Sequence, residues 1–168
     1  PISGDSRGHP TWNGNQVILK GSLHGALGGS FTYRWDPGDG QPAETGNVTD
    51  PYNISVSHTY PDARAKTVFS ARLTVTGTTT VQTSTCVYPV VVYDESEAAQ
   101  AEAAIDDGLW YLHTQMARAN ESGVASGYWE GGAWDVGVTG KAMLAFEIQG
   151  HRADGEAARD PYVETVQR

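Results

Sequence analysis

The sequence predicts a β-sandwich over residues 1–94 and an α-helical region over residues 95–168, which together make a multidomain β plus α protein. Apolar and polar residues alternate with a period of two in the first part, as in strands that bury one face. In the second part the apolar residues recur at helical spacing. The net charge changes at the same place, from −1 over residues 1–94 to −8 over residues 95–168. We therefore place the domain boundary at Asp94.

Several short strands are expected in the first domain. The clearest ones run through Phe31, Tyr33 and Trp35, and through residues 69–75, where every second residue is apolar. Further candidates are the segments 16–23, 52–57 and 81–93. Stretches rich in Gly, Pro and Asp separate these segments, as turns do. Several alternating strands within about 90 residues predict a β-sandwich of immunoglobulin-like size.

Two helices and the start of a third are expected in the second domain. The first follows an acidic, Ala-rich run and has apolar residues at spacings of four, three and four: Ile105, Leu109, Leu112 and Met116. The second is expected from Thr139 to Gly150, and the third from Asp160 and Pro161 onward. Such a set is an incomplete helical array. We expect its apolar stripes to dock on the sheet, on further repeats or on another chain.

The acidic composition argues against nucleic acid as a partner. The 168 residues carry a formal net charge of −9, whereas binding to phosphate backbones depends on clustered Lys and Arg. No apolar run approaches the roughly 20 residues that cross a bilayer. We therefore expect neither nucleic-acid binding nor membrane insertion. The lone cysteine, Cys86, is expected to be a small buried residue.

Three motifs in the first domain resemble one known family. They are YRWDPGDG at residues 33–40, SHTYP at residues 57–61 and the alternating strand at residues 69–75. Over about residues 15–93 they resemble the polycystic kidney disease (PKD) domain, which has a Trp-Asp-Phe-Gly-Asp-Gly turn, a His-Thr-Tyr and an alternating strand in this order. The resemblance implies an immunoglobulin-like β-sandwich that serves extracellular proteins as a spacer, adhesion or binding module.

Residues 98–168 are similar to one repeat of the prenyltransferase and squalene-oxidase family. The similarity lies in AIDDGLWYLHTQM, GYWEGGAW, VGVTGKAMLAFEIQGH and DPYVETVQR. It implies helical hairpins of the kind that build an α/α toroid. The family's cyclases use an Asp-x-Asp-Asp motif, and the pair Asp106-Asp107 lacks the first Asp. Its prenyltransferases use zinc, for which this chain has no recognisable ligand set. We therefore expect no catalytic residues here, and an enzymatic role is left open only for a longer parent protein.

Two acidic residues in the DPGDG turn are the metal candidates. Asp36 and Asp39 are closely spaced carboxylates beside turn carbonyl groups, which is the ligand type that calcium takes. The alternative, which we favour, is that both bond the backbone amides of their own turn. No other cofactor is expected.

Three aromatic residues in a Gly-rich loop are the binding candidates. Tyr128, Trp129 and Trp134 could present flat rings to a sugar or to a partner protein. Equally, they could be buried anchors that attach one helix to the next. The pair Asp106-Asp107 is expected on a solvated face of the first helix, and the five histidines show no metal-ligand spacing.

These observations predict a non-catalytic extracellular or cell-surface module that mediates adhesion or assembly. Its partner would be another protein or a second copy of itself. One alternative is that the chain is the front part of a larger α/α-toroid enzyme with an accessory PKD-like domain. A further alternative is carbohydrate binding through the aromatic loop.

Overall fold

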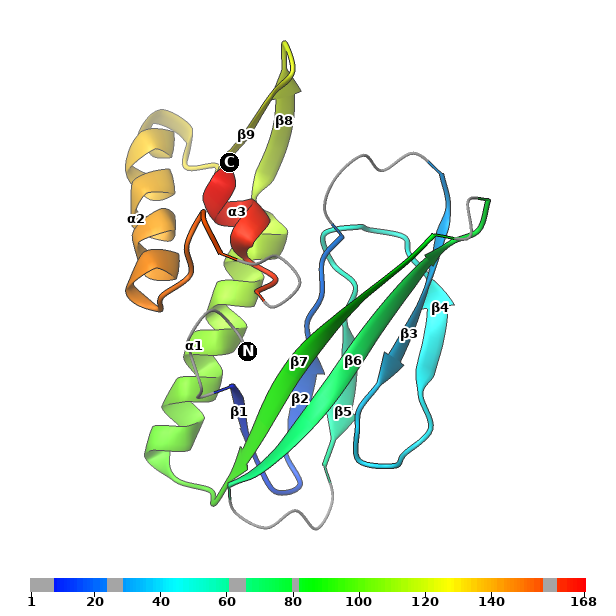
Figure 1. Cartoon of the computed structure of the whole chain (residues 1–168). Coiled ribbons are helices and arrows are strands. Elements are labelled where there is room, and N and C mark those ends of the chain that lie inside the picture. Colours follow the sequence, from blue (N-terminus) through cyan, green and yellow to red (C-terminus); the bar gives the residue numbers. More distant parts are fainter. Residues whose placement is uncertain (1–7, 24–28, 61–65, 80–81, 156–159) are drawn as a thin grey trace.

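The computed structural model describes residues 8–23, 29–60, 66–79, 82–155 and 160–168. It is a mixed β and α structure, in which a β part and a helical part lie side by side (Figure 1). None of the helices in these ranges is long and apolar enough to cross a membrane.

The main sheet has five strands in the order β1-β7-β6-β3-β4. Their bounds are His9–Trp12 for β1, Thr83–Tyr93 for β7, Thr67–Gly77 for β6, Phe31–Asp36 for β3 and Glu44–Asn47 for β4. The strands β1 and β7 are parallel, and the other pairs are antiparallel. A separate antiparallel pair consists of β2 (Gln16–Leu19) and β5 (Val56–Thr59). The alternating segments that predict strands at residues 31–35 and 69–75 lie in β3 and β6.

One apolar core joins the main sheet to the β2–β5 pair. Inward residues of both are buried together, among them Leu19 of β2, Trp35 of β3 and Leu73 of β6. The Trp35 indole donates a hydrogen bond to the carbonyl oxygen of Ile54 at 3.1 Å. A Cβ atom at Gly21 would lie 2.4 Å from Leu73 Cδ2 and 3.2 Å from Trp35 Cζ2, so glycine lets the chain pass close to these core side chains. Trp35 is thus fully buried in this core and held by a hydrogen bond.

The helical part begins with α1 (Glu97–Gln115), which Ser96 caps by accepting a hydrogen bond from Ala99 N at 3.2 Å. A two-stranded ribbon of β8 (Ala117–Glu121) and β9 (Val124–Tyr128) follows. The short 3₁₀ turn η1 (Gly132–Trp134) then leads into α2 (Asp135–Ile148), and α3 (Val163–Gln167) is the last element. The ribbon was not predicted, because its sequence has no alternation of apolar and polar residues.

A second apolar core holds these elements together. Its buried members are Leu109, Trp110, Met116, Trp129, Ala142, Phe146 and Tyr162. Ile18 of β2 packs against this core, so the helical part also contacts the β part. In Figure 1, α1 lies beside β1 and β7, and α2 lies on the side of α1 that faces away from the sheet.

Candidate functional site

A buried ionic cluster joins the β part to α1. Asp106, near the middle of α1, accepts a hydrogen bond from Lys20 Nζ at Oδ2, and its Oδ1 lies 2.8 Å from His9 Nδ1. Lys20 also donates to Asp107 Oδ1 at 2.7 Å. The Lys20 side chain is fully buried, and that of Asp106 is 14% exposed. His9 lies in β1 and Lys20 follows β2, so the cluster connects two strands to one helix.

The position of Asp106 corrects the expectation that this residue lies on a solvated polar face of the helix, because its side chain is only 14% exposed. Successive residues of a helix point about 100° apart. Asp106 therefore faces the sheet, while the Asp107 side chain is 57% exposed. Both carboxylates still reach Lys20, because its long side chain extends between them. The helical pattern alone could not reveal this, since Lys20 is 86 residues away from Asp106 in the sequence.

Two buried tyrosines border the cluster. The Tyr88 hydroxyl donates to Asp106 Oδ2 at 3.4 Å, and its ring stacks on the His9 imidazole with centroids 3.5 Å apart. The Tyr162 hydroxyl donates to the backbone oxygen of Asp106 at 3.4 Å. Burial, reinforced by the negative charge of Asp106, raises the pKa of both hydroxyls well above the usual range. Both tyrosines therefore stay protonated and act as donors.

The carboxyl group of Asp106 is held in its ionised form. Burial alone would raise its pKa, but His9 and Lys20 more than offset this effect, and the pKa lies below its usual value. Among the described residues, His9 Nε2 is a buried side-chain nitrogen without a hydrogen-bond partner. Buried polar atoms of this kind are rare in folded proteins. The single described hydrogen bond of this imidazole is thus the one to Asp106.

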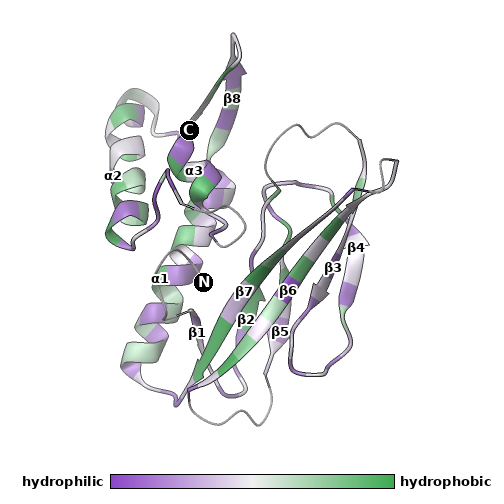
Figure 2. Cartoon of the chain, in the orientation of Figure 1, coloured by the Kyte–Doolittle hydropathy of each residue, from purple (hydrophilic) through white to green (hydrophobic). Residues whose placement is uncertain are grey.

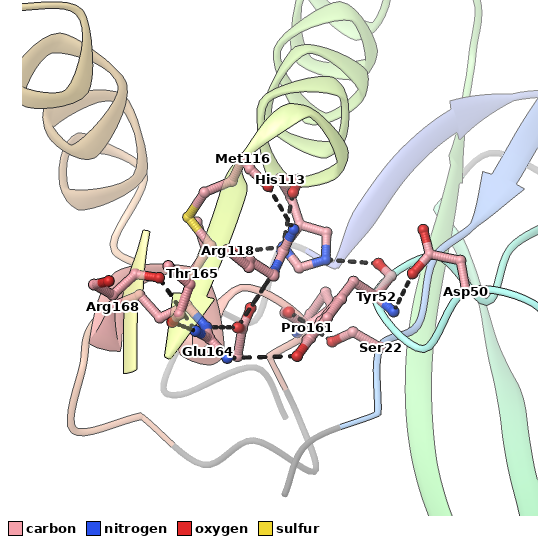
Figure 3. Close-up of polar contacts among 12 residues, drawn as sticks. Ser22, Asp50, Tyr52, His113, Met116, Arg118, Pro161, Glu164, Thr165 and Arg168 are labelled. Carbon is pink, nitrogen blue, oxygen red and sulfur yellow. Dashed lines mark hydrogen bonds and ion pairs between the residues drawn. The ribbon is translucent and has the colours of Figure 1, made fainter. Parts of the chain in front are cut away.

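A second polar network joins α1, β8 and α3 (Figure 3). Glu164 accepts hydrogen bonds from Arg118 Nε at 3.2 Å and from Arg168 Nε. Arg118 also donates to the backbone oxygens of Met116 at 3.1 Å and of His113 at 3.0 Å. The last carbonyl groups of a helix have no partner within the helix. Arg118 therefore caps the C-terminus of α1 while Glu164 holds α3 against it.

His113 extends this network to the β part. It is fully buried, its Nε2 lies 2.8 Å from the backbone oxygen of Tyr52, and its Nδ1 contacts the Thr165 hydroxyl. The Arg118 guanidinium lies over the Tyr52 ring, 4.1 Å from its centroid. The position of Tyr52, which lies in the loop before β5, could not be foreseen from the sequence pattern.

The turn at residues 36–40 uses its carboxylates within the protein. Asp36 Oδ1 accepts from Gly38 N at 3.1 Å, and Asp39 Oδ1 accepts from Gln41 N at 3.0 Å. Asp39 Oδ2 lies 2.8 Å from His58 Nε2. These contacts are those of a self-stabilised turn. In the ranges that the structure describes, no three side chains of His, Cys, Asp or Glu converge as a metal site would require.

The three aromatic candidates do not lie on one surface. Trp129 is only 4% exposed and belongs to the helical core, where its indole bonds the end of α1. Trp134 is 77% exposed and Tyr128 is 41% exposed. Trp129 is therefore a buried anchor between helices, as one of the two interpretations predicts. Trp134, by contrast, is exposed enough to contact a sugar or a partner.

Several large apolar residues of α1 and α2 are exposed, among them Ile105, Leu144 and Ile148, and Figure 2 shows hydrophobic segments recurring along α2. A groove of about 290 Å³ lies between the two helices, lined by Ile105, Gly108, Leu109, Leu112, Ala145, Ile148 and Gln149. Ile148, which lines the groove, is 70% exposed, and Leu144, one turn before it on α2, is 52% exposed. We call this surface, made of the groove residues and Leu144, the hairpin face.

Comparison of the chain with protein-family models, with curated proteins and with solved structures gives no match. Function is therefore inferred below from the residues and contacts of the chain itself.

Proposed function

We propose that the chain is a non-catalytic structural module of extracellular or cell-surface proteins, and that it associates with other copies of itself through the hairpin face. The PKD-like motifs at residues 33–40 and 57–61 support the assignment of the β part to an immunoglobulin-like, PKD-type sandwich. They also support the extracellular setting, because that is where such modules work.

The observation that carries the proposal is the set of exposed apolar residues on the outer side of α2, where they lie among the charged residues Lys141 and Glu147. Its inner side buries Ala142 and Phe146, yet Val136, Leu144 and Ile148 on the outside are 90%, 52% and 70% exposed. Large apolar residues that are exposed close together often mark a site of protein–protein interaction. A second surface of the same kind would bury the outer residues and fill the groove.

The polar residues favour a structural role over a catalytic one. The ion pairs of Lys20 with Asp106 and of Arg118 with Glu164 each connect separate elements of the fold. Their charges are thus neutralised within the protein. The Lys20–Asp106 pair holds α1 against the β part, and the Arg118–Glu164 pair holds α3 against β8, which suits a module that presents a fixed surface.

Sedimentation velocity over a wide range of protein concentration tests this function. We expect the average mass to rise with concentration, and to rise further in moderate salt, because salt screens the repulsion between chains of net charge −9. The variants Leu144→Ser and Ile148→Ser should weaken association about tenfold each, which corresponds to about 1.4 kcal/mol. Val68→Ser is the matched control, because Val68 is 58% exposed but lies on β6. A wild-type chain that stays monomeric at every concentration would refute self-association.

A second candidate is supported by the same surface. In helical arrays each hairpin covers the apolar side of the next. Further hairpins of a longer chain would then cover the hairpin face, and the β part would be an accessory domain of an α/α-toroid protein. A longer form of the protein distinguishes the two cases: it would be monomeric and would protect a cysteine placed at Leu144 from alkylation.

A further inference from the structure

The ionic cluster holds an amine against a carboxyl group in a buried site. Lys20 Nζ contacts Asp106 Oδ2, and no part of the Lys20 side chain is exposed. In water, hydration strongly favours an ammonium and a carboxylate over their neutral products. Burial removes most of that hydration, and the desolvation of two charges opposes folding. For this buried pair, conversion of the two charged groups into a neutral product is therefore far more favourable than it is in water.

The groups around the pair suit a condensation between them. Asp107 Oδ1 lies 2.7 Å from Lys20 Nζ and is partly exposed, so it can accept a proton from the ammonium group and exchange it with solvent. His9 Nδ1 and the Tyr88 hydroxyl lie 2.8 Å and 3.4 Å from the two oxygens of the Asp106 carboxyl group. Hydrogen bonds at these oxygens stabilise the negative charge on them while a nucleophile adds.

We propose that Lys20 and Asp106 condense into an intramolecular amide that joins Nζ to Cγ. The ammonium group passes one proton to the Asp106 carboxylate that it contacts, and the free amine adds to Cγ of the resulting neutral carboxyl group. Asp107 takes a second proton from the nitrogen and passes it to the hydroxyl group of the adduct, which leaves as water. The two hydrogens of this water are the two that Nζ loses. The ammonium and the carboxylate are replaced by one neutral amide and one water molecule, so no oxidant or co-reactant is needed. The fixed contact between the two groups replaces the high concentration that this reaction requires in solution.

The amide links the residue after β2 to the middle of α1, which are 86 positions apart in the chain. A cross-link that closes so long a loop restricts the unfolded chain strongly. The β part and α1 therefore stay attached when the chain unfolds. This bond is independent of self-association, because the cluster lies between the β part and α1 and contributes no residue to the hairpin face.

The intact mass of the denatured full chain tests the proposal. We expect a mass lower than the sequence mass by one water molecule, together with a branched peptide that joins Lys20 to Asp106 in a proteolytic digest. A wild-type mass equal to the sequence mass would overturn the proposal and leave the cluster as an ion pair. The absence of the branched peptide would do the same.

The matched variant is Lys20→Arg, which keeps the positive charge but has no amine that forms the amide. We expect it to have its full sequence mass and a lower melting temperature than the wild type. Cyclisation at Asp107-Gly108 to a succinimide also removes one water, but it would persist in this variant and hydrolyse at mildly alkaline pH. A water loss that survives Lys20→Arg would therefore overturn the amide. Should Lys20→Arg fail to fold, the branched peptide of the wild type decides alone.

Discussion

The Trp129 indole donates a 2.7 Å hydrogen bond to the backbone oxygen of Leu112. Leu112 lies in the last turn of α1, where carbonyl oxygens have no partner within the helix. One side chain in the loop after β9 therefore both fills the helical core and satisfies the end of α1.

Removing this hydrogen bond is expected to destabilise the helical part. Trp129→Phe keeps an aromatic ring but leaves the buried Leu112 oxygen without its donor, which should lower the free energy of unfolding by about 2 kcal/mol. Urea denaturation followed by circular dichroism measures the change. Trp134→Phe is the control and should have almost no effect, because Trp134 is 77% exposed.

The pairing of Glu164 with two arginines predicts a large effect of Glu164→Gln. The Glu164 side chain is 10% exposed, so the variant leaves Arg118 and Arg168 with an uncompensated, mostly buried charge. We expect a loss of about 3 kcal/mol in the free energy of unfolding. Asp154→Asn removes an ion pair with Arg152 in which both side chains are more than 70% exposed, and it should leave stability unchanged. Equal effects of the two variants would contradict a structural role for the Glu164 network.

Two glycines in the turn at residues 36–40 should respond differently to alanine. Both have positive φ, +79° for Gly38 and +86° for Gly40, so alanine is strained at either position by about 1 kcal/mol. At Gly38 the new Cβ would also lie 2.8 Å from the backbone oxygen of Ser70, whereas at Gly40 nothing lies within 4 Å. Gly38→Ala should therefore lower the melting temperature more than Gly40→Ala. Equal shifts would mean that the turn is not seated on β6.

Calcium is expected to leave the melting temperature unchanged. All four carboxylate oxygens of Asp36 and Asp39 already lie within hydrogen-bond distance of Gly38, Arg34, Gln41 or His58. A cation that bound the folded state would raise the melting temperature with its concentration. Differential scanning fluorimetry in millimolar calcium and in a chelator makes the comparison, and a calcium-dependent rise would identify a metal site here.

Cys86 should be alkylated slowly at neutral pH. Burial raises the pKa of its thiol to about 11, and the thiolate is the reactive form. At pH 8 only about one thousandth of the thiol is ionised, and the rate with iodoacetamide should rise about tenfold per pH unit up to that pKa. Alkylation in urea, where the thiol has an ordinary pKa near 8.5, provides the reference rate. Cys86 is half-buried rather than fully buried, and a native rate equal to the urea rate would contradict even this partial burial.

Local patterns predicted those parts of the fold in which one side of an element is apolar. The alternation around Trp35 and Leu73 predicts β3 and β6 because both strands have one buried face. The stripe from Ile105 to Met116 predicts α1 for the same reason. The ribbon of β8 and β9 has no buried apolar face, because its large apolar residues Val124 and Tyr128 are 67% and 41% exposed, so it has no clear pattern to detect. Its place depends instead on contacts such as that of Arg168 with the backbone oxygens of Ala119 and Ser126.

The candidate site was less predictable, because its residues meet only in the folded chain. His9, Lys20 and Asp106 come from two strand segments and a helix, and no spacing between them marks their contact. From the sequence, Asp106 was expected on a solvated face of its helix, where most helical aspartates lie. Asp106 lies on the buried side of the helix instead, because Lys20 is buried and a buried charge needs a partner of opposite charge.

The parallel pairing of β1 with β7 has a mechanical consequence. His9 pairs with Val90 and Trp12 with Tyr93, and β7 leads into α1 within three residues. A pulling force applied at the start of β1 and at α1 acts along both strands in opposite directions. It therefore loads their inter-strand hydrogen bonds in shear, all at the same time, instead of opening them one after another like a zipper. A module tethered at these two points would resist stretching better than its thermal stability suggests.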